Sequence, residues 1–217
     1  MIVARLLFMN LPRVSWVVYT LTVGILQFIV TMPLADLDIT IYVSTSAHLS
    51  YAQPVCTLIE ASARVRGTGI AKRDPEYVRT KIRNGNAVIA LREDTLVGFC
   101  YIETWDHGRY VANSGLVVAP EFRRMGMASK IKSAAFALAR RNYPTAKIFG
   151  ITTSLPVMRI NSRLGYQPVT FSELTQDEVF WKGCQSCPNY DILQRNERRI
   201  CLCTGMLYDP NDPHPKN

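Results

Sequence analysis

The chain has 217 residues, of which 48% are hydrophobic, and a formal net charge of +8. This length fits a single domain with extensions, and the hydrophobic fraction is sufficient for a sizeable core. The basic residues are scattered along the chain, and no strand combines them with aromatic residues, so we expect no nucleic-acid partner. A small polyanionic ligand explains the positive charge more simply.

The N-terminal stretch carries no charged residue between Arg13 and Asp36 and is long enough to cross a bilayer as a helix. Arg5 and Arg13 precede it, so as an anchor it would keep the N-terminus in the cytoplasm and the rest of the chain outside. Two other interpretations remain: a signal peptide with a poor cleavage site, or an upstream extension of a protein that starts near Met32.

From residue 39 onwards the elements are legible from periodicity and from turn residues. Asp74 followed by Pro75 predicts the start of a helix that ends at Asn84-Gly85. The whole pattern predicts an α+β fold with a mixed, mostly antiparallel central sheet and helices on both faces. The expected strands are 39–43, 87–93, 95–105, 109–119 and 146–153, and the expected helices are 48–65, 75–83 and 154–164.

A loop joins the strand that ends near residue 119 to a helix whose apolar positions begin at Met127. The first N–H groups of a helix have no intrahelical acceptor, and the helix dipole places partial positive charge there. Arg123 and Arg124 add charge, and Gly126 allows close approach to the backbone. The segment 123–128 is therefore a candidate diphosphate site.

Arg-x-x-Gly-x-Ala at 123–128 resembles the acyl-CoA loop of the GNAT N-acetyltransferase superfamily. The ending Leu164-Gly165-Tyr166, after a strand and a short helix, resembles the closing motif of the same superfamily. The resemblance covers residues 39–171 and implies an acyl-CoA-dependent N-acyltransferase with acetyl-CoA as cosubstrate. It also implies that one strand binds the pantetheine arm and that the loop binds the diphosphate, which gives as cofactor-binding residues Leu116, Val117, Val118, Arg123, Arg124, Met125, Gly126, Met127 and Ala128.

Many members of this superfamily carry a general-acid Tyr at the position that Asn161 occupies here, so Tyr166 and Ser154 are the nearby substitutes. A thiol with a pKa of about 8.5 also leaves tolerably as thiolate without help. For a base we consider Glu103 and His107, acting through a water; the alternatives are an outward strand residue and a solvated loop histidine.

The acceptor site of the superfamily corresponds to the basic loop around Gly67-Thr68-Gly69. Arg66, Lys72 and Arg73 could grip a carboxylate there, although a basic surface loop is the alternative. The loop RGTGIAKR at 66–73 and the ending CQSC…CLCTGMLYDP at 184–210 resemble those of a bacterial subgroup linked to arginine biosynthesis, which implies an amino acid such as glutamate as acceptor. The other function that we retain is a degenerate acyl-CoA sensor that docks a partner.

The C-terminal segment departs from the superfamily pattern. Thr175-x-x-Glu178 predicts a capping box at the start of a short helix. Cys184-x-x-Cys187 and Cys201-x-Cys203, the latter expected on a strand, suit a tetrahedral zinc site, with two disulfides or free thiols as alternatives. Cys56 and Cys100 are expected in the core.

We therefore expect a hydrophobic extension that need not be part of the native protein, an acyltransferase domain, a cysteine-rich extension and a flexible tail. We expect a cytoplasmic protein without membrane attachment, since acyl-CoA is cytosolic, and the sequence is compatible with a homodimer. The expected boundaries are 1–37, 38–172, 173–208 and 209–217.

Overall fold

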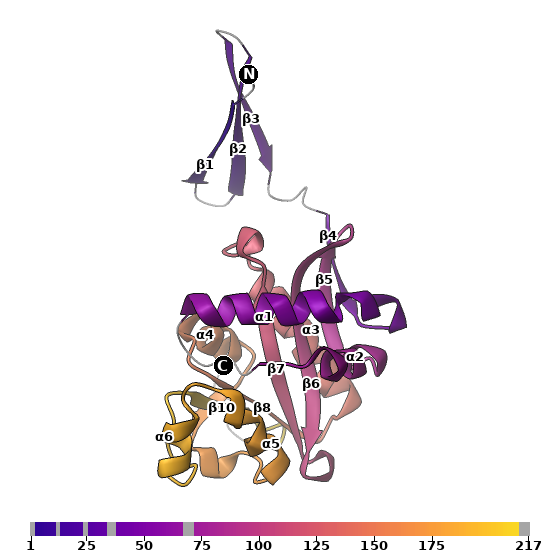
Figure 1. Cartoon of the computed structure of the whole chain (residues 1–217), viewed down its shortest axis with the longest axis vertical. Coiled ribbons are helices and arrows are strands. Elements are labelled where there is room, and N and C mark those ends of the chain that lie inside the picture. The colour runs from indigo at the N-terminus through magenta and orange to yellow at the C-terminus, as the bar shows by residue number, and fades with distance from the viewer. Residues whose placement is uncertain (1–2, 12–13, 24–25, 34–37, 67–71, 213–217) are drawn as a thin grey trace. The chain divides into compact units, whose positions relative to one another are not determined.

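The structure, a computed structural model, describes residues 3–11, 14–23, 26–33, 38–66 and 72–212. The chain divides into two compact units, Met1–Ile39 and Thr40–Asn217. In the first unit the apolar stretch forms an antiparallel three-stranded sheet rather than a helix (Figure 1), with strands β1 (Val3–Leu11), β2 (Val14–Val23) and β3 (Leu26–Pro33). None of the described helices combines the length and the apolarity needed to cross a membrane.

The second unit is built on a seven-stranded sheet with the order β4-β5-β6-β7-β8-β10-β9. The pair β7–β8 is parallel, whereas the pairs β5–β6, β6–β7, β8–β10 and β10–β9 are antiparallel. The predicted α+β fold with a mostly antiparallel sheet is confirmed. The strands are β4 (Ile39–Val43), β5 (Ala87–Arg92), β6 (Thr95–Trp105), β7 (Tyr110–Val118), β8 (Lys147–Thr152), β9 (Gln167–Val169) and β10 (Thr204–Tyr208).

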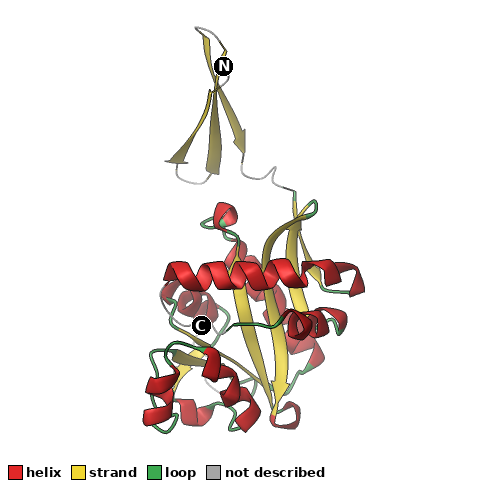
Figure 2. Ribbon diagram, in the orientation of Figure 1, coloured by secondary structure: helices red, strands yellow, loops and turns green. Residues whose placement is uncertain are grey.

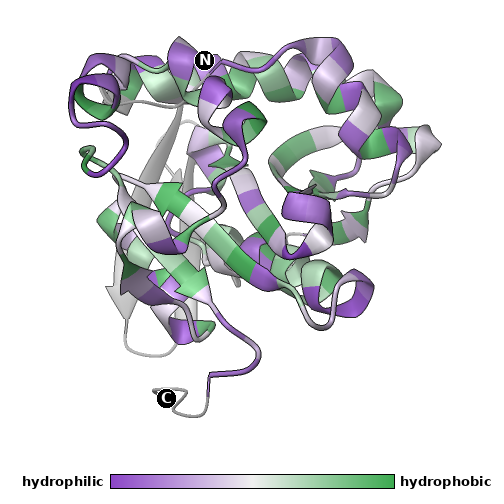
Figure 3. Ribbon diagram, turned by 90° about the horizontal axis from the view of Figure 1, so that it is seen from below, coloured by the Kyte–Doolittle hydropathy of each residue, from purple (hydrophilic) through white to green (hydrophobic). Residues whose placement is uncertain are grey.

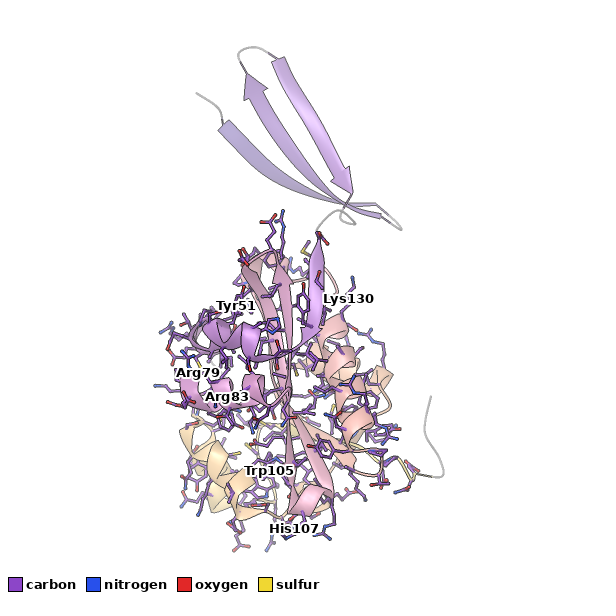
Figure 4. The ribbon with its side chains drawn as sticks, turned by 90° about the vertical axis from the view of Figure 1, so that its right-hand side faces the viewer. Tyr51, Arg79, Arg83, Trp105, His107 and Lys130 are labelled. Carbon is purple, nitrogen blue, oxygen red and sulfur yellow. The ribbon has the colours of Figure 1, made fainter. Side chains whose placement is uncertain are left out.

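Helices cover both faces of this sheet (Figure 2). Seen from the side, α1 (Ala52–Arg66) and α2 (Pro75–Arg83) lie on one face together with the C-terminal helices α5 (Glu178–Lys182) and α6 (Tyr190–Arg195), while α3 (Met127–Asn142) and α4 (Leu155–Arg163) lie on the other (Figure 4). The predicted start of α2 is confirmed, because the Asp74 carboxylate accepts from the N–H groups of Glu76 and Tyr77.

The C-terminal segment completes the sheet instead of forming a separate extension. Strand β10 lies between β8 and β9, and so the boundary expected at residue 172 falls inside one continuous sheet. The predicted capping box at Thr175 is also wrong. Thr175 is fully buried and its hydroxyl donates to Asp106 at 2.6 Å, so the cap is supplied by Asp177, whose carboxylate accepts from the Val179 N–H at 2.8 Å.

Two hydrophobic clusters pack against the same face of the sheet. The first joins α1 and α2 to β5–β7, and the second joins α5 and α6 to β7, β8 and β10. Hydrophobic residues form stretches along the central strands. On the surrounding helices, hydrophobic and polar residues alternate (Figure 3). The space between the two clusters is where the candidate site lies.

Candidate functional site

The site begins where two parallel strands separate. Strands β7 and β8 pair only over Tyr110–Ala112 and Lys147–Phe149, so that Asn113 and Gly150 are the first residues beyond the paired stretch. A cavity of about 650 Å³ opens there, lined by both strands, by α1, α2, β6 and α4, and by the C-terminal helices. The end of strand pairing thus gives a ligand access to the middle of the sheet.

A β-bulge shapes the β7 wall of the cavity. Phe99 pairs with Val117 and Tyr101 pairs with Ser114, so β7 carries one extra residue at this point. Gly115 lies in the bulge with a φ of 68°, and a Cβ there would come within 2.5 Å of the Tyr101 ring. Gly115 and Leu116 both line the cavity, and Gly115 has no side chain to cover its backbone there.

The three residues predicted to bind the pantetheine arm do not share one role. Leu116 lines the cavity. Val117 belongs to the core cluster under α1, and Val118, 8% exposed, accepts a hydrogen bond from Arg123 through its carbonyl. Their contribution to ligand binding would come from the backbone of the strand.

The predicted diphosphate loop turns sharply into α3. Arg124 and Gly126 adopt left-handed conformations with φ of 63° and 77°, and helix α3 starts at Met127 with no acidic residue in its first turn. Met127 is buried, Ala128 and Met125 are half-buried, and Arg124 is exposed. No acidic side chain in the first turn of α3 thus offsets the partial positive charge of its first N–H groups, as an anion site requires.

Arg123 has a bracing role that the sequence did not indicate. Its Nε donates to the Val118 carbonyl at 3.0 Å and its Nη2 to the Ser62 hydroxyl at 3.1 Å. These bonds tie the loop to β7 and α1. Both arginines are exposed, and Arg123 is the one that these two bonds hold in place.

A charged cluster forms another wall of the cavity. The Glu103 carboxylate accepts from the Tyr77 hydroxyl at 2.5 Å and also from the Lys81 ammonium. The Arg73 Nε donates to the Tyr101 hydroxyl at 2.7 Å. Burial raises the pKa of both tyrosines, so that both hydroxyls stay protonated. Arg73, Tyr77, Tyr101 and Glu103 all line the cavity.

The remaining predicted catalytic and acceptor residues differ in their position relative to the cavity. His107 is exposed at the tip of the β6–β7 hairpin and does not line the cavity (Figure 4). Lys72 is exposed and also lines the cavity. Arg66 ends α1, but its side chain falls outside the described residues, as do residues 67–71.

The structure places Asn161 and the two substitutes considered for a general acid, Tyr166 and Ser154, in different surroundings. Asn161 lines the cavity and is 1% exposed; its Nδ2 donates to the Met206 sulfur at 3.6 Å, and its Oδ1 has no hydrogen-bond partner among the described residues. Tyr166 is fully buried against Phe136 and Tyr208 and is not part of the cavity lining. Burial raises the pKa of Tyr166, which keeps it protonated. Ser154 precedes α4 without capping it through its side chain.

Sequence reasoning missed Lys132, which lines the cavity from α3 and is only 2% exposed. Its ammonium donates to the Asn113 carbonyl at 3.1 Å. The available signal was its position: Lys132 lies among the buried apolar residues of α3, on the face that a surface lysine would avoid.

All four C-terminal cysteines line the cavity as free thiols. Cys184 and Cys187 form a short turn, closed by a 2.9 Å bond from the Cys187 N–H to the Cys184 carbonyl, while Cys201 and Cys203 precede β10 instead of lying on a strand as predicted. In the part of the chain that is described, no three His, Cys, Asp or Glu side chains form a group that could hold a metal ion. The structure thus does not support the predicted zinc site.

Residues 58–154 match the model of the Acetyltransferase (GNAT) family. A comparison with curated protein sequences finds no match. N-acetylglutamate synthase from Neisseria gonorrhoeae, solved with coenzyme A and N-acetyl-glutamate, shares 17% identity with a TM-score of 0.57, over 80% of this chain and 35% of that one. This chain therefore spans about a third of that enzyme's length.

Two further structures align over nearly their whole length. Rv2747 from Mycobacterium tuberculosis, solved with CoA, shares 16% identity with a TM-score of 0.57 and is 98% covered by 78% of this chain. The putative acetyltransferase yncA from Salmonella typhimurium, solved with acetyl-CoA, shares 13% identity with a TM-score of 0.54 and is 98% covered by 83% of this chain. These likenesses concern the fold. The family match covers residues 58–154, and the mixed α+β fold of the chain is consistent with the GNAT fold.

Proposed function

We propose that this protein is an acyl-CoA-dependent N-acyltransferase that acylates the amine of a small amino acid-type acceptor such as glutamate. The observation that carries the proposal is the cavity between β7 and β8, which reaches the bulged backbone at Gly115 and the polar cluster around Arg73 and Glu103. One cavity thereby offers places for both a thioester and a polar acceptor.

The residues present fit an acyl-CoA cosubstrate. The loop at Arg124–Met127 would receive the diphosphate, and the exposed backbone of β7 would hold the pantetheine arm. A backbone N–H near the bulge would then polarise the thioester carbonyl, and such a preorganised donor is the largest catalytic contribution in many acyl transfers. A cytoplasmic location, where acyl-CoA is available, is part of this proposal.

Arg73 and Lys72 would bind the carboxylate of the acceptor, because a guanidinium can bind a carboxylate bidentately. An α-amine has a pKa of about 8 and needs little help to lose its proton. The Glu103 carboxylate would attract the ammonium form of the acceptor, and the proton of that ammonium would pass to a water. The Neisseria synthase structure with N-acetyl-glutamate makes glutamate the first acceptor to test, and it motivates the proposed place in arginine biosynthesis.

One observation favours a second candidate function, an acyl-CoA sensor without turnover. Asn161 stands where many relatives carry a general-acid tyrosine, and the Tyr166 hydroxyl, the nearby substitute, lies outside the cavity lining. A sensor would bind acyl-CoA with the same loop but would not transfer the acyl group.

The experiment is an incubation of the protein with acetyl-CoA or succinyl-CoA and each member of an amino acid panel, followed by mass spectrometry of the products. We expect one N-acylated amino acid that carries a second carboxylate. Binding of acyl-CoA without any acylated product would favour the sensor. No binding would contradict both candidate functions.

A further inference from the structure

A buried lysine stands at the point where β7 and β8 separate. The Lys132 ammonium donates to the carbonyl of Asn113, the first β7 residue beyond the paired stretch. A Cβ placed on Gly150, the corresponding residue of β8, would lie 3.9 Å from the Lys132 Nζ. The ammonium therefore occupies the junction between the strands.

The polar atoms around this junction are incompletely satisfied. Among the described residues, Asn113 Nδ2 and Asn161 Oδ1 are buried without a hydrogen-bond partner, and both side chains line the cavity. Asn113 is 4% exposed and Asn161 1%. Buried polar groups in native proteins are nearly always hydrogen-bonded, so one unpartnered atom on each of two amides that line a cavity indicates a polar ligand.

The charge of Lys132 is not neutralised by a carboxylate in the described part of the chain. Its titratable neighbours are the Cys100 thiol on β6 and the Tyr166 hydroxyl, whose ring centroid lies 5.6 Å from Nζ. Burial raises the pKa of Cys100 to about 11 and raises that of Tyr166 as well, so both remain neutral at neutral pH. A cation with neutral neighbours in a buried site attracts a developing negative charge strongly.

We propose that Lys132 is a catalytic residue that donates a proton to the sulfur of coenzyme A as the thioester breaks. This inference rests on the proposed function. Asn161 has no acidic hydroxyl that could protonate the leaving sulfur, so this inference assigns that protonation to a residue of α3. Burial lowers the pKa of Lys132, which makes its ammonium a better proton donor than an exposed lysine.

The step balances as follows. The amine nitrogen attacks the thioester carbonyl carbon, the new C–N bond forms, and the C–S bond breaks with its electron pair on sulfur. The sulfur takes a proton from Lys132 Nζ and leaves as the free thiol. The proton released by the amine nitrogen passes to water, and water returns a proton to Lys132.

The test compares Lys132→Met and Lys132→Arg with the matched control Lys130→Met, which removes an exposed lysine from the same helix (Figure 4). The first measurement needs no acceptor: ultraviolet absorbance of the thiolate is titrated in the complex with CoA, with desulfo-CoA as the blank for protein thiols. The second is kcat against pH with the acceptor found in the product screen. Lys132→Gln replaces the Met variant if that variant fails to fold.

We expect the bound thiol to titrate at lower pH than free CoA in the wild type, the control and Lys132→Arg, but not in Lys132→Met. We expect kcat to fall by about 10²- to 10⁴-fold in both Lys132 variants, the range that a general acid contributes. In the wild type, kcat should decline at alkaline pH as the Lys132 ammonium loses its proton. Arginine keeps the charge but does not release its proton, so this decline should be absent in Lys132→Arg.

An unchanged thiol titration and an unchanged kcat in Lys132→Met would overturn the role of Lys132 while leaving the proposed function intact. A full rescue of kcat by Lys132→Arg would contradict proton donation. Failure of the wild type to bind CoA in calorimetry would overturn the proposed function and the Lys132 role with it.

Discussion

The Tyr77 hydroxyl donates to the Glu103 carboxylate across 2.5 Å and so links α2 to β6 at the wall of the cavity. Lys81, one turn further along α2, binds the other carboxylate oxygen, and its side chain is only 12% exposed. Removing one partner of a largely buried ion pair leaves the other charge buried and unpaired. The resulting loss of folding stability is larger than the net stabilisation that the pair provides.

Glu103→Gln should therefore lower the free energy of unfolding by about 1–3 kcal/mol, because the Lys81 ammonium loses its carboxylate. The double variant Glu103→Gln with Lys81→Met should recover part of this loss. Urea denaturation measures both. The control is Glu76→Gln, which removes exposed pairs with Arg79 and Arg83 and should change stability by less than about 1 kcal/mol. Equal decreases in the free energy of unfolding for the Glu103 and Glu76 variants would show that the buried pair stabilises the fold no more than an exposed pair.

Arg124→Glu should weaken acyl-CoA binding about 10- to 100-fold, because it replaces a charge-assisted contact to the diphosphate with repulsion. Calorimetry with CoA measures the effect. Arg141→Glu, an exposed change at the opposite end of α3, makes the same charge reversal as a control. Similar affinities in the two variants would remove the loop from the binding site. Arg124 is preferable to Arg123 here, since Arg123 also braces the loop.

Arg73→Gln should raise the KM of the acceptor about tenfold or more and leave acyl-CoA affinity unchanged, because the lost contact is to the acceptor carboxylate. Lys72→Gln, an exposed neighbour, should have a smaller effect. Steady-state kinetics with both substrates varied separates the two constants. A parallel loss of affinity for both substrates would indicate disruption of the fold instead.

The C-terminal thiols make stability depend on alkaline pH. Burial raises the pKa of Cys184 to about 11, and burial with the neighbouring thiols raises that of Cys203 to about 12. Unfolded thiols titrate near pH 8.5, so the stability from the protonated thiols is complete below about pH 8.5 and is lost as pH rises through the folded values.

The free energy of unfolding should therefore fall from about pH 8.5 upwards, and Cys184→Ser should make that fall shallower. Denaturation curves at a series of pH values measure the slope. Identical slopes in the wild type and the variant would contradict the buried protonated thiol.

Elemental analysis of the same preparation tests for zinc. One equivalent of metal would restore the site that sequence spacing predicts and that the described structure does not support.

Local signals predicted much of the fold. Asp74-Pro75 marks the start of α2, and the alternating segments around β5–β7 predict their own pairing, because these elements are set by neighbours in sequence. Long-range relations were less accessible. Nothing local indicates that β10 enters the sheet between β8 and β9, and the apolar stretch of the first unit carries no periodicity that distinguishes strands from a helix.

The candidate site divides in the same way. The turn into α3 was predicted from Gly126 and the arginines, since it depends on a short segment. The pairing of Glu103 with Lys81 and the approach of Lys132 to Asn113 join residues from different elements, which spacing in the sequence does not show. His107 lies away from the cavity for a related reason. It follows Glu103 closely along the chain, but the hairpin turns at Asp106–Gly108 and carries it to the tip.

The most direct test of the central claim is the release of free CoA from acetyl-CoA, measured with and without glutamate and the other acceptor amino acids. We predict release that depends on the amine and equals the amount of N-acylated product one for one. Release that is independent of any amine, or no release from a protein that binds acetyl-CoA, would contradict the assignment as an N-acyltransferase.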